Sequence, residues 1–143
     1  MRYPEQLIIP MRKDLTQYGV QETRTPEEVK QALMDRNGTV LMVVNSVCGC
    51  AAGKARPAVG LALKHHPHPD KVATVFAGAD LEAVQTVREL IPDHPPSSPS
   101  MALFRDGKPV FVLQRHQIET RQADQIAELL IEAFDQYCVT AKQ

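Results

Sequence analysis

Long apolar runs, tryptophan and any excess of charge of one sign are missing from this sequence of 143 residues. No apolar stretch approaches the roughly 18 residues needed to cross a bilayer, which argues against a membrane protein. The 16 basic and 17 acidic residues nearly cancel, so no broad surface of one charge attracts nucleic acid or a membrane. Apolar residues make up 43% and charged residues 23% of the chain, as in ordinary globular domains. We therefore expect a folded domain with neither nucleic acid nor a membrane as a partner.

Cysteine is also scarce, with three residues in the whole chain. An odd number in a chain of this size does not build a framework of structural disulfides. The first residues, MRYPEQLIIPMRKD, contain only a short apolar stretch and so lack the pattern of a secretion signal. We therefore expect a cytoplasmic protein. In a reducing compartment, Cys48 and Cys50, one residue apart, indicate redox chemistry or metal binding.

The chain length suits one domain with a buried core, and we expect a single domain over residues 1–143. Its first part, residues 1–17, is predicted to be a helical extension with a helix over 4–17. The remaining pattern predicts strands at about 19–24, 39–45, 71–76, 101–105 and 109–113, and helices over 25–37, 50–64, 81–90 and 121–138. This βαβαβαββα order predicts an α/β fold whose mixed sheet is flanked by helices.

Local signals support these boundaries. Thr25-Pro26-Glu27-Glu28 is typical of a helix start, with Thr25 as the N-cap and a capping box. Asp80 is predicted to cap the helix that follows it. Pro57 is expected to kink the helix over 50–64, with the strain eased at Gly53, four residues earlier. Asp106-Gly107 predicts a tight turn between the last two strands.

The sequence Cys48-Gly49-Cys50 lies where the apolar strand 39–45 is followed by a helix. The N-terminus of a helix exposes unpaired N–H groups and stabilises an anion. A thiolate at Cys48 should therefore form more easily than in a free cysteine, and the thiolate is the attacking species. Gly49 supplies the backbone freedom that a disulfide to Cys50 requires. Such a short bridge should be more readily reduced than a structural disulfide.

The segment VNSVCGCAAGKARP (44–57) and the order of elements resemble the bacilliredoxin family, whose members carry a CGC or similar motif at this place. The resemblance covers nearly the whole chain. It implies a thioredoxin-like fold with an extra N-terminal helix, and an enzyme that reduces mixed disulfides between proteins and bacillithiol or another low-molecular-weight thiol. In that reaction Cys48 would be the nucleophile that takes up the small thiol, and Cys50 would resolve or regulate the adduct. S-thiolated proteins are then the partners and the small thiol the co-substrate, with no bound cofactor; disulfide isomerase activity is a broader expectation.

The resemblance also implies a cis-proline that faces the motif. Pro99, just before the strand at 101–105, occupies the matching position. We expect it to keep Ser98 extended, so that the backbone of Ser98 pairs with an incoming substrate. Lys54 and Arg56, in the first turns after the motif, either lower the pKa of Cys48 and receive the carboxylates of a small thiol, or are solvated charges.

The chain differs from ordinary thioredoxins at two positions near the motif. Val47 precedes the first cysteine where a thioredoxin has tryptophan. Met42 stands in the preceding strand where a thioredoxin has a buried acid. Both differences argue against efficient recycling by a standard thioredoxin reductase.

The histidine-rich segment 64–70 (KHHPHPD) has the residue types of a metal site. A helix from Cys50 to His65 would span about 20 Å, so these histidines and the cysteines of one chain cannot share a metal ion. We interpret the segment as a solvated turn whose imidazoles suit the negative end of a helix. Cys138 is interpreted as a packing residue, and His94 and His116 as loop or surface residues.

A competing hypothesis is a binding module in which Cys48 and Cys50 hold a metal ion or an iron–sulfur cluster across a dimer. Two thiolates do not complete a tetrahedral site, so this hypothesis needs ligands from a partner chain. A third interpretation, in which the two cysteines are merely small packing residues, is disfavoured by their place at a strand–helix junction. Metal content after anaerobic purification distinguishes the redox protein from the metal-binding module.

Overall fold

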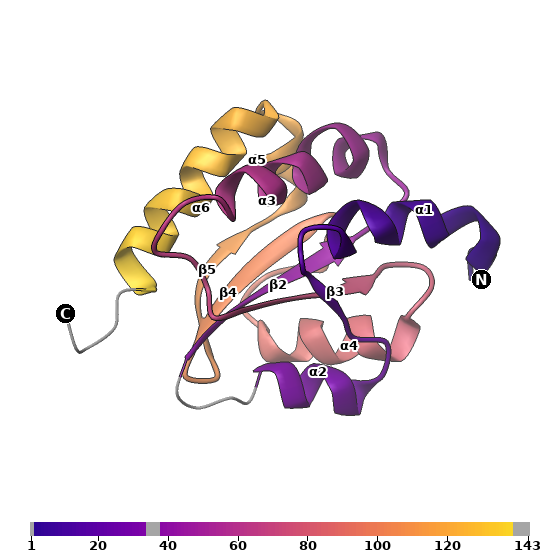
Figure 1. Ribbon diagram of the computed structural model, residues 1–143. Helices are drawn as coiled ribbons and strands as arrows, with labels where there is room; N and C mark the ends of the chain where they lie inside the picture. Colours follow the sequence, from indigo (N-terminus) through magenta and orange to yellow (C-terminus); the bar gives the residue numbers. More distant parts are fainter. Residues whose placement is uncertain (1, 34–37, 139–143) are drawn as a thin grey trace.

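The computed structural model, described here for residues 2–33 and 38–138, has a five-stranded sheet between two layers of helices (Figure 1). Helices α1, α3 and α6 cover one face of the sheet, and α2 and α4 cover the other (Figure 1). The elements in chain order are α1 (Glu5–Thr16), β1 (Gln21–Glu22), α2 (Pro26–Leu33), β2 (Thr39–Asn45), the π-helical turn η1 (Ala51–Ala55), α3 (Arg56–Ala62), β3 (Lys71–Phe76), α4 (Leu81–Leu90), β4 (Ser100–Arg105), β5 (Lys108–Leu113), α5 (Arg115–Glu119) and α6 (Ala123–Tyr137). Within the described residues, no helix is long and apolar enough to cross a bilayer.

The sheet has the mixed arrangement that the element order predicts. Its strand order is β1-β3-β2-β4-β5. Strands β1 and β2 run parallel to β3, whereas β4 is antiparallel to both β2 and β5. Because β2 lies at the centre of the sheet, its carboxyl end is flanked by β3 on one side and β4 on the other.

Strand β2 is buried along its whole length and contributes to both hydrophobic cores. Leu41 and Val43 point into the core beneath α1, α3 and α6. Val40, Met42 and Val44 point into the core beneath α2 and α4. This alternation follows from the two-residue repeat of a strand, and it explains why the β2 sequence is apolar without interruption.

The N-terminal helix and the N-cap of α2 form as predicted, but the second hydrogen bond of the expected capping box does not. Helix α1 matches the expected helix over 4–17, and its Ile8 and Leu15 are fully buried. Thr25 Oγ1 accepts the backbone N–H of Glu28 at 3.2 Å, as an N-cap should. The carboxylate of Glu28 accepts a hydrogen bond from the backbone N–H of Arg24 at 2.7 Å, and not from the N–H of Thr25. The predicted end of this helix, at 34–37, lies outside the described residues.

The expected single helix over 50–64 is divided into η1 and α3. Pro57 lies in the first turn of α3, a position at which proline is tolerated. In a regular α-helix, the ring of Pro57 would clash with the carbonyl of Gly53, four residues earlier. Gly53 lies in η1, whose π-helical turn is wider. The strain predicted at Pro57 is therefore accommodated by a π-helical turn.

The prediction that Asp80 caps α4 with its side chain is wrong. Asp80 stands at the N-cap position but makes no side-chain cap hydrogen bond. Its carboxylate instead accepts the N–H of Phe76 at 3.0 Å and two hydrogen bonds from the guanidinium of Arg12, at 2.8 and 2.9 Å. A buried arginine from α1 competes better for this carboxylate than a helix N–H, because the ion pair compensates two buried charges at once.

The C-terminal third is close to expectation, with one added helix. Asp106 and Gly107 both have positive φ, 52° and 83°, as the tight turn between β4 and β5 requires. The predicted helix over 121–138 is α6, and α5 before it was not predicted. Helix α5 begins at Gln114, whose N–H donates to Gln117 Oε1 at 2.9 Å. Glutamine is not a preferred N-cap residue, so the sequence lacks the usual start signal.

Candidate active site

Cys48 lies three residues beyond β2, at the start of the helical segment that continues into η1 and α3. Its carbonyl accepts the N–H of Ala51 at 2.9 Å, which closes the first helical turn around the motif. Its own N–H donates to Ser46 Oγ at 3.2 Å. Ser46 is held in turn by Asn45 Oδ1, which accepts its N–H at 2.9 Å. The end of a fully buried strand therefore positions Cys48, as the sequence predicted.

The sulfur of Cys48 accepts a hydrogen bond from the backbone N–H of Cys50 at 3.3 Å. Both cysteines are free and partly exposed, so the structure shows the dithiol form. Gly49 does not adopt a positive φ, and a Cβ added to it would meet nothing within 4 Å. The dithiol form thus does not require glycine here, and the role expected of Gly49 in a closed disulfide stays a prediction.

The two thiols have pKa values shifted in opposite directions. Burial by itself would raise the pKa of Cys48, but hydrogen bonds from the side chain and N–H of Cys50, the charge of Arg115 and the N–H of Ala51 lower it overall. Burial raises the pKa of Cys50, and the hydrogen bond and charge of Cys48 raise it further. These shifts favour the thiolate form at Cys48 and the protonated form at Cys50.

Arg115 is the cation beside the motif, and sequence reasoning missed it. Its N–H donates to Ser97 Oγ at 3.3 Å, its Nη1 to the carbonyl of Ser98 at 3.4 Å and its Nε to Glu119 Oε2 at 3.2 Å. The charges of both motif cysteines contribute to raising the pKa of Arg115, after its hydrogen bond to Glu119. Arg115 begins a helix that was not predicted, far along the chain from Cys48, so only the fold brings them together.

Lys54 and Arg56, the cations that the sequence suggested, are held elsewhere. Lys54 Nζ donates to the carbonyl of Glu119 at 2.6 Å, at the end of α5. Arg56 is buried and its Nη1 pairs with Asp14 Oδ2 at 2.8 Å and with the carbonyl of Met11 at 3.3 Å. Each therefore ties the motif helix to a neighbouring helix.

Ser98 and Pro99 occupy the position at which the resemblance implied a cis-proline. The Ser98–Pro99 peptide bond is cis, which confirms that expectation, and Pro99 is buried just before β4. Ser98 and Cys48 line the same surface cleft. The carbonyl of Ser98 accepts Arg115, so the arginine is attached to the same loop that faces the cysteines.

This cleft has a volume of about 330 Å³ and opens at the carboxyl end of β2. Its lining contains one cysteine of the motif, Cys48, together with two arginines and several polar residues. The charged and polar residues that line it are Tyr3, Ser46, Cys48, Arg88, Ser98 and Arg115. Cys48 therefore shares this cleft with two positively charged residues.

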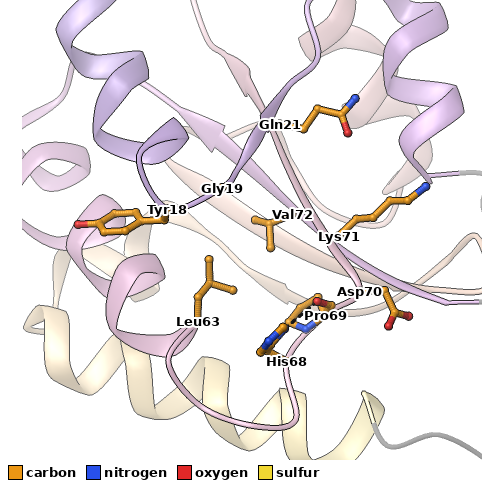
Figure 2. Close-up of a pocket in the computed structure, with 9 residues that line it drawn as sticks. All are labelled: Tyr18, Gly19, Gln21, Leu63, His68, Pro69, Asp70, Lys71 and Val72. Atoms are coloured by element: carbon orange, nitrogen blue, oxygen red, sulfur yellow. Dashed lines mark hydrogen bonds between the residues drawn. The ribbon is translucent and has the colours of Figure 1, made fainter.

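A second hollow of about 350 Å³ lies at the opposite end of the sheet, where β3 begins (Figure 2). Tyr18 and Leu63 lie on one side of it, and His68 and Pro69 on another (Figure 2). Its lining includes no cysteine. It therefore offers no thiol to a ligand.

The histidine-rich segment is less solvated than expected. It follows α3, which ends at Ala62. His65 Nε2 lies 2.8 Å from Asp135 Oδ1 of α6, and His68 Nδ1 lies 2.9 Å from the carbonyl of Pro69. In the described part of the chain, no group of three histidine, cysteine, aspartate or glutamate residues could hold a metal ion. His94 and His116 are exposed, as predicted.

Cys138 is remote from the motif. It is buried in the core beneath α6, and burial raises the pKa of its thiol. It therefore packs as the sequence suggested, and both its protonation and its burial make it a poor nucleophile.

The chain is similar to known proteins both in sequence and in fold. A sequence family described as disulphide isomerase matches residues 3–138. A bacilliredoxin of Salinibacter ruber is 57% identical over 96% of this chain and 82% of its own length. A bacilliredoxin of Koribacter versatilis is 52% identical over 95% of this chain and 94% of its own.

Solved structures agree on the fold. The thioredoxin of Malassezia sympodialis superimposes with a TM-score of 0.56 at 18% identity, covering 84% of this chain and 91% of that one. The thioredoxin of Fasciola hepatica gives 0.57 at 15% identity, covering 82% and 99%. Identities this low speak for the fold alone, whereas the sequence matches speak for the family. The chain therefore belongs to the bacilliredoxin family of oxidoreductases and has a thioredoxin-like fold with an additional N-terminal helix.

Proposed function

We propose that this protein removes a low-molecular-weight thiol, bacillithiol or a chemically similar one, from S-thiolated proteins. The observation that carries the proposal is the contrast between the two motif cysteines. Cys48, with its lowered pKa, opens into a cleft and accepts the N–H of Cys50. Cys50, two residues further along the chain, has a raised pKa, which favours the protonated thiol. One sulfur is thus suited to attack and the other to resolve the product.

In the first step, the thiolate of Cys48 attacks the sulfur of the small thiol in the mixed disulfide. A new S–S bond forms between Cys48 and the small thiol, and the S–S bond to the target protein breaks. The target cysteine leaves as a thiolate and takes a proton from solvent. One disulfide is consumed and one is formed, so no external oxidant or reductant is needed for this step.

In the second step, Cys50 loses its proton to solvent and attacks Cys48 Sγ. The Cys48–Cys50 bond forms, and the small thiol leaves as a thiolate that is then protonated. A reducing dithiol or two molecules of the free small thiol must reduce this disulfide before the next cycle. Because free thiols of this kind are maintained in reducing compartments, we propose the cytoplasm as the location. No other cofactor takes part in this scheme.

The division of labour between the two thiols is testable with single substitutions. Cys48→Ala should abolish release of the target thiol, because the attacking sulfur is gone. Cys50→Ala should still release it once and then accumulate a mixed disulfide between Cys48 and the small thiol. Intact-mass spectrometry after incubation with a protein carrying one S-thiolated cysteine measures both outcomes. The matched control is Cys138→Ala, which should turn over as the wild type does.

Two results would contradict the proposal. Full activity of Cys48→Ala with an inert Cys50→Ala would reverse the roles, and full activity of both would remove the motif from the reaction. The metal-binding alternative is tested on the same preparations. Stoichiometric zinc or iron in protein purified anaerobically, lost in Cys48→Ala, would favour a metal centre completed by a partner chain.

A further inference from the structure

The cleft beside Cys48 contains two arginines and no acidic side chain in its lining. Arg88 comes from α4 and Arg115 from α5. These helices lie in opposite layers of the fold (Figure 1), and a residue of each lines the cleft. A cleft lined by two positively charged residues and a reactive cysteine is suited to an anionic ligand.

The side chain of Arg88 has an unsatisfied donor. Its Nε is buried and has no hydrogen-bond partner within the described residues. The structure also gives its guanidinium no ion pair in that part of the chain, whereas the other arginine with an unpartnered Nε, Arg56, has its charge paired with Asp14. A buried donor without a partner is costly. The positive charge of Arg88 is therefore available to an anion in the cleft that this residue lines.

Arg115 is the second arginine in the lining of the cleft. Its guanidinium holds the carbonyl of Ser98 and the carboxylate of Glu119, yet the side chain is about half exposed, at 47%. A guanidinium has five N–H donors in a planar fork, so those two acceptors do not exhaust it. Carboxylates match this fork with paired, charge-assisted hydrogen bonds.

We propose that Arg88 and Arg115 bind a carboxylate of the small thiol, so that the site selects acidic low-molecular-weight thiols. This inference rests on the proposed function, because it assigns the cleft to the small-thiol half of the mixed disulfide. It also sets the direction of attack. A carboxylate held in the cleft brings the sulfur of its own molecule to Cys48, and the target cysteine, on the outer side of the S–S bond, becomes the leaving group. The arginines exchange no proton in this reaction.

The test compares three symmetrical disulfides that differ in charge. They are 3,3′-dithiodipropionate, which is anionic, bis(2-hydroxyethyl) disulfide, which is neutral, and cystamine, which is cationic. The rate constant for adduct formation on Cys48 is measured by intact mass in a Cys50→Ala background. Each rate constant is divided by the rate constant for the reaction of the same disulfide with a free model thiol. This division corrects for the intrinsic reactivity of each probe. We expect the order anionic, neutral, cationic, from fastest to slowest.

Arg88→Gln should lower the ratio of the anionic to the neutral rate by about 10-fold, as expected for loss of a charge-assisted hydrogen bond. Arg88→Lys keeps the positive charge but loses the planar fork of N–H donors. Its ratio of the anionic to the neutral rate should lie between those of the wild type and Arg88→Gln. The matched control is Arg105→Gln, which changes the net charge equally. Arg105 is exposed and lies opposite Thr39 in the sheet, at the end of β2 that is far from the cleft. The Arg105→Gln variant should therefore keep the wild-type ratio of the anionic to the neutral rate. Circular dichroism confirms that each variant is folded.

The outcomes separate the two proposals. Unchanged ratios in Arg88→Gln and Arg88→Lys, with Cys48 still reacting, would overturn the carboxylate site and leave the proposed function standing. An equal fall in Arg105→Gln would also overturn it, because the preference would then reflect net charge. Failure of Cys48 to react with all three probes would overturn the proposed function itself.

Discussion

At the scale of single residues, a cation that is distant in sequence contributes to the lowered pKa of Cys48. The thiolate is the reactive form, so a lowered pKa increases the fraction that can attack at neutral pH. The hydrogen bonds that lower the pKa come from the motif itself, and the charge comes from Arg115. The nearby Lys54 is instead bonded to the carbonyl of Glu119. Position along the chain is thus a poor guide to which charge acts on the sulfur.

Alkylation with iodoacetamide across a range of pH tests this assignment. In the wild type, the rate at Cys48 should rise and level off at lower pH than the rate at Cys50, because the two pKa values are shifted in opposite directions. Arg115→Gln removes a positive charge that favours the thiolate, so the midpoint for Cys48 should move to higher pH. Peptide mass spectrometry resolves the two sites. The comparison variant is Lys54→Gln, and a larger shift there than in Arg115→Gln would refute the assignment.

At the scale of elements, a buried ion pair attaches the N-terminal helix to the rest of the fold. Arg12 of α1 and Asp80, just before α4, are both nearly inaccessible, and their closest atoms lie 2.8 Å apart. Burial disfavours the charge of Arg12, but hydrogen bonds to Asp80 and Glu5 raise its pKa overall. The guanidinium also lies 5.3 Å from the centre of the Phe76 ring. Two segments distant in sequence, α1 and residues 76–80, therefore meet at one arginine.

Asp80→Ala should lower the free energy of unfolding by about 3–5 kcal/mol, because it leaves Arg12 charged and buried without its main partner. The N–H of Phe76 loses its acceptor as well. Urea denaturation followed by circular dichroism gives the value. Asp93→Ala, at an exposed aspartate in a loop, serves as the control and should change stability by less than about 0.5 kcal/mol. A similarly small effect of Asp80→Ala would show that the ion pair contributes little.

At the scale of the whole molecule, β2 joins the two cores and ends at the active site. Its odd-numbered apolar residues pack under one helical layer, and its even-numbered ones under the other. Neither core can lose its packing without exposing a face of the same strand. We therefore expect the domain to unfold in one cooperative transition, as small single domains usually do.

Leu41→Ala and Met42→Ala test this coupling from opposite faces, since both side chains are fully buried. Each should lower the free energy of unfolding by about 2–5 kcal/mol. Cys138 is a natural probe because it is buried in only one of the two cores. In a background where Cys48 and Cys50 are replaced by alanine, its thiol labelling should follow the same urea transition as circular dichroism for both variants. Separate transitions in Met42→Ala would show that the cores unfold independently.

The sequence by itself determined the features that are local. Apolar β-branched runs predicted β2 and β3, Asp106-Gly107 predicted the hairpin turn, and the place of Cys48 after a buried strand predicted a nucleophile at a helix start. Each of these depends on neighbours within a few residues, which a pattern records directly. The family resemblance added the cis-proline at Pro99, because no local rule distinguishes that bond from an ordinary one.

Only the tertiary structure decided which distant groups meet. It replaced Lys54 and Arg56 with Arg115 and Arg88 at the cleft, and it turned Asp80 from a helix cap into the partner of Arg12. The physical reason is the same in both cases. A charged side chain takes the partner that the packed fold brings within hydrogen-bond distance, and helices from opposite layers converge at the end of β2, whatever their separation along the chain.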